Sequence, residues 1–215
     1  MGVLKSFLEG AVKSQRYLLD DFITETQTYL SGKIVALKQK ETELLDSGDV
    51  DKLEDFYDYH DTDYYHFSEA FPNILHESMV ILLYSNFEHY LNKLCECECY
   101  EKKSNIKYTD IAGNGIFRTV KYLQLICGFN LGKSKCWSEI EYFNKIRNAL
   151  VHSHGIISEN KIISAKSYSR KMFELVNQFT DPSGQKCGEI KFNDTALQYF
   201  NNLVHNFMKE LFDQL

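Results

Sequence analysis

The sequence predicts an all-α fold, an antiparallel helical bundle that carries an N-terminal helical extension. Prolines are rare: the 215 residues contain only Pro72 and Pro182, so long segments lack the strongest helix breaker. Apolar residues recur at spacings of three and four over long stretches, which is typical of amphipathic helices. Hydrophobic residues make up 44% of the chain, enough for a folded core. We therefore expect a helical extension over residues 1–70 and a helical domain over residues 71–215.

The first segment, from residue 3 to about residue 45, is predicted to be helical, with Ser31-Gly32 as a candidate break between two helices. A turn is expected over residues 46–49, where Asp49 can cap the next helix. Residues 54–67 mix acidic and aromatic side chains. This segment is either a recognition surface for a basic partner or, as we favour, an exposed segment whose aromatic side chains dock on the core.

Three further helices are expected between residues 72 and 151. The first begins at Pro72, where a missing N–H costs nothing, and runs to about residue 102. The others cover residues 116–127 and about 135–151 and are separated by a loop over residues 128–134.

After residue 152 the helical spacing of apolar residues gives way to short runs typical of strands. Two short β-like runs around a turn at Glu159-Asn160 predict a β-hairpin over residues 155–163, and a helix is expected from about residue 165 to 180. Residues 181–184 (Asp-Pro-Ser-Gly) predict a turn, and residues 189–192 a short extended run. Asp194 is expected to cap a closing helix that reaches residue 215.

Charge is unevenly distributed along the chain, whose net charge is −6. Residues 118–171 contain ten basic and three acidic residues, a net charge of +7, whereas the remainder has 14 basic and 27 acidic residues, a net charge of −13. A local basic region of this kind can hold a phosphate backbone on an acidic protein, although scattered surface lysines would give the same count.

No apolar run is long enough to span a bilayer, and no secretory signal opens the chain, so we expect a cytoplasmic protein with no membrane partner. The six cysteines are then expected to be reduced. Cys95 and Cys99 share a helix face, while Cys97 points away, so these residues favour a structural role over a metal site. No metal or other cofactor is expected.

The segment around Arg147, Asn148 and His152 carries the strongest functional signal. On a helix Asn148 and His152 lie one turn apart, and the long side chain of Arg147 can reach the same region. A histidine can transfer protons near neutral pH, and an arginine can stabilise charge on phosphorus oxygens. This combination suits cleavage of RNA by its own 2′-hydroxyl, a reaction that needs no metal because the substrate supplies the nucleophile.

The R-N-x-x-x-H pattern at the end of a helix resembles the signature of the HEPN superfamily, and residues 82–91 resemble the first core helix of that family. The resemblance covers residues 73–215. It implies an endoribonuclease with Arg147, Asn148 and His152 as catalytic residues, and a homodimer in which two motifs face each other. It also implies a toxin or antiviral defence role, with a cognate antitoxin or regulatory protein as a further partner besides RNA.

Three other residues are candidates for substrate binding, each with a plainer alternative. Lys145 can contact the RNA backbone or be a solvated lysine, and His154 can shuttle protons or be an exposed turn residue. Glu88 can orient Arg147 through a bidentate pair or form a structural ion pair.

The alternative function is a catalytically inactive HEPN module that binds a protein or nucleotide partner, and a third reading is a helical scaffold without a site. The sequence lacks the glycine-rich motifs of P-loop NTPases and dinucleotide enzymes and the G-x-S-x-G of serine hydrolases.

Overall fold

The computed structural model describes residues 2–159 and 171–215, and it confirms that the fold is mostly helical. The helices are α1 (Val3–Ser47), α2 (Val50–Tyr65), α3 (Phe71–Glu101), α4 (Gly115–Tyr122), α5 (Trp137–Ser153) and α7 (Ala196–Gln214). The strands are β1 (Ile156–Ser158), β2 (Phe173–Thr180) and β3 (Lys186–Phe192).

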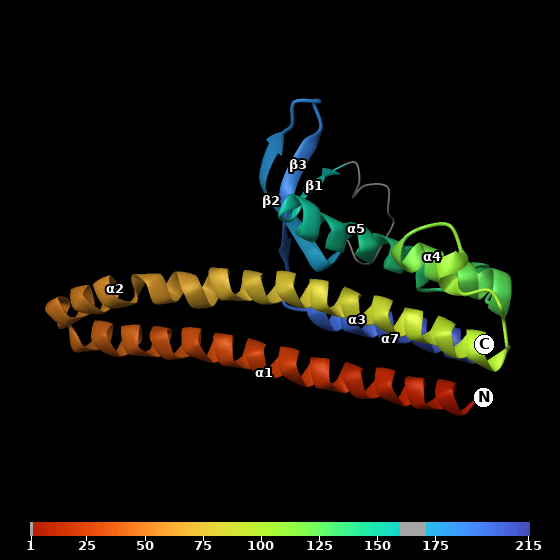
Figure 1. Cartoon of the computed structure of the whole chain (residues 1–215). Helices are drawn as coiled ribbons and strands as arrows, with labels where there is room; N and C mark the ends of the chain where they lie inside the picture. Colours follow the sequence, from red (N-terminus) through yellow and green to blue (C-terminus); the bar gives the residue numbers. More distant parts are fainter. Residues whose placement is uncertain (1, 160–170) are drawn as a thin grey trace.

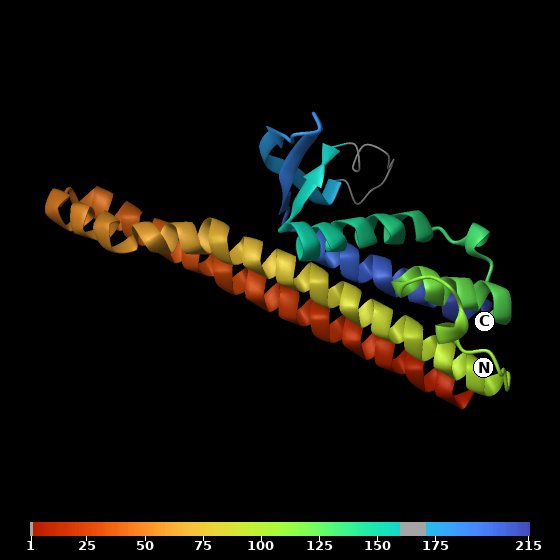
Figure 2. The same ribbon diagram turned by 45° about the horizontal axis from the view of Figure 1, so that its top comes forward.

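The long helices form three layers (Figure 1). Helices α3 and α7 lie side by side in the middle layer, with α1 on one side of them and α5 on the other. Helices α1 and α5 run antiparallel to the two middle helices, and both chain termini lie at the same end of the bundle (Figures 1 and 2).

One apolar core joins these layers. Phe143 of α5 stacks on Phe200 of α7 with ring centroids 4.5 Å apart, and Phe87 of α3 meets Phe207 of α7 at 5.8 Å. Helix α1 contributes to the same core through residues on one face: Leu8, Val12, Leu19 and Ile23. The boundary at residue 70 stays a prediction, but the first half of α1 packs against α3 and α7.

The predicted break at Ser31-Gly32 is wrong, because α1 continues as one helix to Ser47. A glycine inside a helix costs only about 1 kcal/mol relative to alanine. Packing of α1 against α2, α3 and α7 offsets this cost.

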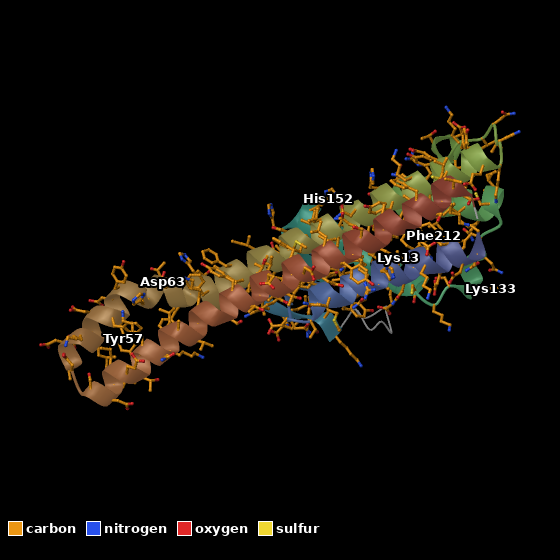
Figure 3. The ribbon with its side chains drawn as sticks, turned by 90° about the horizontal axis from the view of Figure 1, so that it is seen from below. Lys13, Tyr57, Asp63, Lys133, His152 and Phe212 are labelled. Atoms are coloured by element: carbon orange, nitrogen blue, oxygen red, sulfur yellow. The ribbon has the colours of Figure 1, made fainter. Side chains whose placement is uncertain are left out.

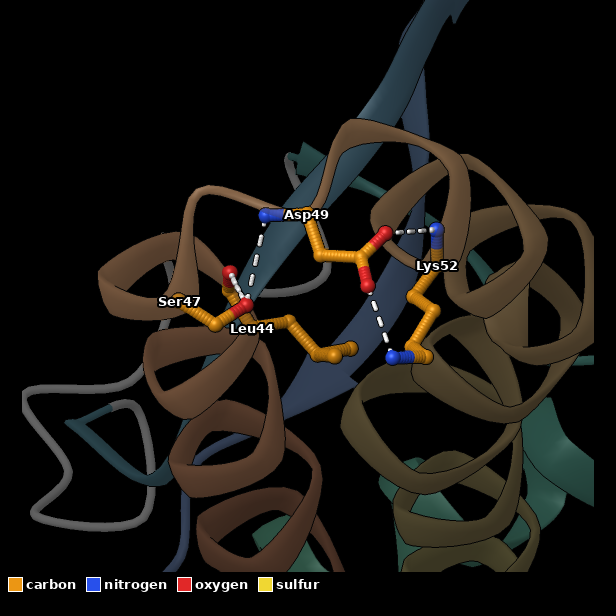
Figure 4. A network of polar contacts seen from close by, with 4 residues as sticks. All are labelled: Leu44, Ser47, Asp49 and Lys52. Carbon is orange, nitrogen blue, oxygen red and sulfur yellow. Dashed lines mark hydrogen bonds and ion pairs between the residues drawn. The ribbon is translucent and has the colours of Figure 1, made fainter.

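The turn between α1 and α2 is the one the sequence predicts, with Asp49 as the cap (Figure 4). The Asp49 carboxylate accepts from the backbone N–H of Lys52 at 3.2 Å and pairs with the Lys52 ammonium at 2.7 Å. Gly48 adopts a φ of +68°, and the Ser47 hydroxyl accepts from the Asp49 N–H.

The acidic and aromatic segment, residues 54–67, lies in α2 and the π-helical turn His66–Ala70 that leads into α3. Together with the second half of α1, it forms an arm that projects from the bundle (Figure 1). Phe56 is buried on this arm, and the hydroxyls of Tyr57 and Tyr64 both donate to Glu41 of α1. The aromatic residues therefore dock on α1 and not on the main core, while Tyr59 is 79% exposed.

The next helices agree with the prediction. Pro72 is the second residue of α3, and the helix continues directly from the π-helical turn His66–Ala70. The segment predicted as one helix over residues 116–127 is α4 followed by a π-helical turn over Leu123–Cys127.

The expected all-α fold needs one correction, because β1, β3 and β2 form an antiparallel sheet in that order. Strand β1 pairs with β3. The second half of the predicted hairpin, residues 160–163, lies outside the described residues, so the hairpin itself stays a prediction. The helix predicted over residues 165–180 is wrong for Phe173–Thr180, which is strand β2, while its first residues lie outside the described part of the chain.

The chain between β2 and β3 turns at Asp181, as predicted. Its carboxylate accepts from the N–H groups of Ser183 and Gln185, and Gly184 has a φ of +83°. The predicted cap of the last helix is wrong: α7 begins at Ala196, and Asn193, not Asp194, accepts from the Thr195 N–H and hydroxyl.

Candidate nucleolytic site at the end of helix α5

The candidate site lies at the C-terminal end of α5, where the helix stops in a left-handed turn. His154 and Gly155 have φ angles of +48° and +77°, and the Gly155 N–H donates to the Ala149 carbonyl at 3.1 Å. This is the C-terminal geometry that glycine favours, because it has no Cβ. The helix ends at Ser153, two residues beyond the predicted end at residue 151, so His152 lies in its last turn.

A closed set of contacts holds Arg147 and Asn148. The Arg147 guanidinium donates to Oδ1 of Asn148 at 2.9 Å, and the Asn148 amide donates to Oδ1 of Asn144 at 3.4 Å. The Tyr84 hydroxyl of α3 donates to the same Asn144 oxygen at 2.6 Å. The Arg147 guanidinium carbon lies 5.0 Å from the centroid of the Tyr84 ring, which completes the circuit through a cation–π contact.

Tyr84 anchors this network in the core. Its side chain is 3% exposed and packs edge-on against Phe143 and Phe87. Burial and the nearby Glu88 carboxylate raise the pKa of the Tyr84 phenol, and Arg147 offsets part of that rise. The phenol therefore stays protonated and keeps donating to Asn144 over the whole range in which proteins are stable.

The network does not use all the donors of Arg147. The Nε atom of Arg147 is buried and has no hydrogen-bond partner among the described residues. Because Nε is buried, an anion would have to bind the terminal nitrogens of the guanidinium. No described carboxylate forms an ion pair with Arg147, so such binding would not first have to break one.

His152 is one turn beyond Asn148, and its side chain is exposed (Figure 3). No hydrogen bond or ion pair joins it to another described residue. Asn144, Asn148 and His152 follow one another at four-residue intervals, so they form a polar row along α5. The row places the exposed imidazole of His152 one turn from Asn148, which holds the Arg147 guanidinium.

The other candidates do not join this network. Lys145 is exposed on α5 and forms no ion pair with a described residue. His154 interacts electrostatically with Glu77 of α3: burial and Glu189 raise the pKa of Glu77, and His154 offsets part of that rise.

Glu88 forms no ion pair with Arg147 within the described part of the chain, although both affect the pKa of Tyr84. Its carboxylate lies beside the first turn of α4, where a Cβ on Gly115 would be 3.3 Å from Oε1. Partial positive charge at a helix N-terminus stabilises a carboxylate in this place.

Sequence reasoning missed Tyr84 and Asn144. The four-residue spacing of Asn144, Asn148 and His152 was a usable signal for Asn144. Tyr84 had none, because only the packing of α3 on α5 shows that it lies under Arg147.

The surroundings of the site are only partly described. Of the ten basic residues counted between positions 118 and 171, Lys161, Lys166 and Arg170 lie outside the described residues.

Within residues 2–159 and 171–215, no cluster of three or more His, Cys, Asp or Glu side chains has the arrangement of a metal site. Cys95 and Cys99 instead donate to backbone carbonyls of Thr119 and Ser104. None of the described helices is both long and apolar enough to cross a membrane.

Comparison with models of protein families, with curated proteins and with solved structures finds no match to this chain.

Proposed function

We propose that this protein is a metal-independent endoribonuclease of the HEPN type, which acts in the cytoplasm as a homodimer. The observation that carries the proposal is the Tyr84–Asn144–Asn148–Arg147 circuit, which fixes a guanidinium one helical turn from the exposed His152. The R-N-x-x-x-H spacing adds the resemblance to HEPN ribonucleases.

The proposed reaction is an internal transesterification. The 2′-oxygen of a ribose attacks the adjacent phosphorus and the bond from phosphorus to the 5′-oxygen breaks, which leaves a 2′,3′-cyclic phosphate and a 5′-hydroxyl. One imidazole removes the proton of the 2′-hydroxyl, and a second acid protonates the 5′-oxygen. Arg147 stabilises the additional negative charge on the phosphorus oxygens in the transition state, and Asn148 positions the guanidinium.

A homodimer follows from the number of histidines in the motif. Each chain supplies one motif histidine, His152, whereas the base and the acid are separate groups in this reaction. Two copies of the α5 end, facing each other, would bring two imidazoles and two guanidinium groups to one phosphate. A toxin or antiviral role, with an antitoxin or another regulatory protein as partner, is part of the same proposal by resemblance alone.

The test is cleavage of a mixed-sequence single-stranded RNA in EDTA by wild type, Arg147→Ala and His152→Ala. A matched control is His89→Ala, because His89 is also an exposed helix histidine, its ring lies against the neighbouring Tyr90, and it takes no part in the Arg147 network. We expect wild type and His89→Ala to cleave alike. His152→Ala should lose about 10²–10⁴-fold in rate, the usual contribution of a proton-transfer group. Arg147→Ala should lose about 10²–10³-fold, the usual cost of removing a donor that stabilises charge in the transition state.

Equal cleavage by His152→Ala and wild type would refute the assignment of His152. Absence of cleavage by all four folded proteins, for every RNA in a randomised pool, would instead favour the inactive binding module. Far-UV circular dichroism of each variant establishes that it is folded.

A further inference from the structure

Helix α1 carries a second apolar stripe, which no other part of residues 2–159 and 171–215 covers. Phe7 is 79% exposed, Leu18 62%, Phe22 51% and Tyr29 59%. Seen from below, α1 lies in front of α3 and α7, and no other element lies over it (Figure 3).

The stripe has the spacing of a helix–helix seam. Steps of three and four residues connect ten positions of α1, which are Leu4, Phe7, Ala11, Ser14, Leu18, Phe22, Glu25, Tyr29, Gly32 and Ala36. At about 100° per residue, the stripe is centred roughly 120° around the helix from the face that packs on α3 and α7. The helix therefore has two separate apolar faces, and only one of them contributes to the core.

We propose that this stripe is a homodimer seam, in which α1 of a second copy of the chain packs antiparallel with Leu18 on the two-fold axis. In this register Ser14 of one chain lies opposite Phe22 of the other, and Leu4 lies opposite Gly32. Small residues thus face large ones, and Phe7 faces Tyr29. A self-complementary surface of this kind is what a two-fold interface requires.

Gly32 supports the pairing independently. A glycine inside a helix is unfavourable by about 1 kcal/mol relative to alanine. A Cβ at this position would meet no atom within 4 Å, so packing within the chain does not require glycine here. The absence of a side chain does allow a second helix to approach closely.

Charge selects the antiparallel direction. Glu25 is the one ionised side chain among the ten stripe positions. Parallel helices in register would place Glu25 against Glu25 of the partner, a like-charge contact that weakens an interface. The antiparallel register places Ala11 of the partner opposite Glu25.

The exposed area is sufficient for a specific interface. With aromatic side chains offering 150–250 Å² each, the exposed fractions of Leu4, Phe7, Leu18, Phe22 and Tyr29 amount to about 600 Å² per chain. Two copies would together bury about 1,200 Å², the lower end of the range for stable complexes.

This interface does not depend on the proposed ribonuclease activity. Helices α1 and α5 lie on opposite sides of the middle layer (Figure 1), so a dimer through α1 leaves the end of α5 accessible in both chains. If two α5 ends also pair, each chain uses two different interfaces and the protein forms assemblies larger than a dimer.

The first test is the solution mass of full-length wild type and of Leu18→Glu/Phe22→Glu, measured by sedimentation equilibrium over a range of concentrations. The matched control is Leu45→Glu, since Leu45 is also exposed, at 55%, but lies on another face of the same helix. We expect the double variant to be a monomer where wild type is a dimer, or a dimer where wild type is a larger assembly because two α5 ends also pair. Leu45→Glu should have the wild-type mass. Two results would overturn the proposal. One is a wild type that stays monomeric at a protein concentration 100 times the lowest that the assay detects, and the other is an unchanged mass for the folded double variant.

The second test fixes the register by disulfide cross-linking, with wild type as the control for the native cysteines. Leu18→Cys is expected to form a covalent dimer on oxidation because two copies of position 18 meet on the axis. Phe7→Cys is expected to cross-link only in combination with Tyr29→Cys. A covalent dimer from Phe7→Cys alone would overturn the antiparallel arrangement.

Discussion

The hydrogen bond between Tyr84 and Asn144 should show measurable energetic coupling. Tyr84→Phe removes the hydroxyl but keeps the ring beneath Arg147, and we expect a loss of about 1 kcal/mol in the free energy of unfolding, the net value of one hydrogen bond. Asn144→Ala leaves the Tyr84 hydroxyl buried without this acceptor, so the expected loss is larger, about 2–3 kcal/mol.

The double variant Tyr84→Phe/Asn144→Ala measures the coupling energy between these two residues. Once the hydroxyl is absent, Asn144→Ala strands no buried donor on Tyr84. The combined loss should therefore be smaller than the sum of the single losses by about 1 kcal/mol. Urea unfolding followed by circular dichroism, at one protein concentration because dimerisation stabilises the fold, measures all four proteins. Additivity within about 0.3 kcal/mol would refute the network as described.

Three further predictions concern the core, the helix end and pH. Phe143→Ala should lower the free energy of unfolding by about 3–5 kcal/mol in urea titrations, because this fully buried ring stacks on Phe200. Gly155→Ala should cost about 1 kcal/mol, since an L-residue is strained at a φ of +77°, and a loss below 0.2 kcal/mol would contradict that reading. Burial lowers the pKa of His76, so the unfolded chain binds this proton more tightly; the stabilising contribution is complete above the unfolded pKa of about 6.5 and falls as the pH drops through it. The stability difference between wild type and His76→Leu, measured in urea from pH 8 to pH 5.5, should therefore change in favour of the variant, and a constant difference would contradict the assignment.

The long helices could be predicted because their periodicity extends over many turns. Amphipathic spacing and the scarcity of proline identified α3, α5 and α7 to within a few residues, and the Asp49 cap follows from local chemistry. Gly32 misled the prediction, since local helix propensity is a weak signal beside packing along a 45-residue helix.

The sheet could not be predicted for the opposite reason. Strand β2 has no clear alternation. On its other edge β3 pairs with β1, which places Ile157 opposite Gly188, a contact between residues that are distant in the chain. Strand identity depends on such partners more than on local preference. The same limit applies to Tyr84, which meets Asn144 and Arg147 only through the packing of α3 on α5. By contrast, the residues that share α5 could be grouped from their spacing alone.

The most direct test of the proposed chemistry is to map one cleavage site in a short RNA with wild-type protein in EDTA, and then to remove the 2′-hydroxyl at that position only. We expect a 2′,3′-cyclic phosphate or 3′-phosphate and a 5′-hydroxyl from the natural RNA, and no cleavage at the deoxy position. Cleavage of the deoxy substrate, or products with a 5′-phosphate, would contradict attack by the 2′-hydroxyl and with it the roles proposed for Arg147 and His152.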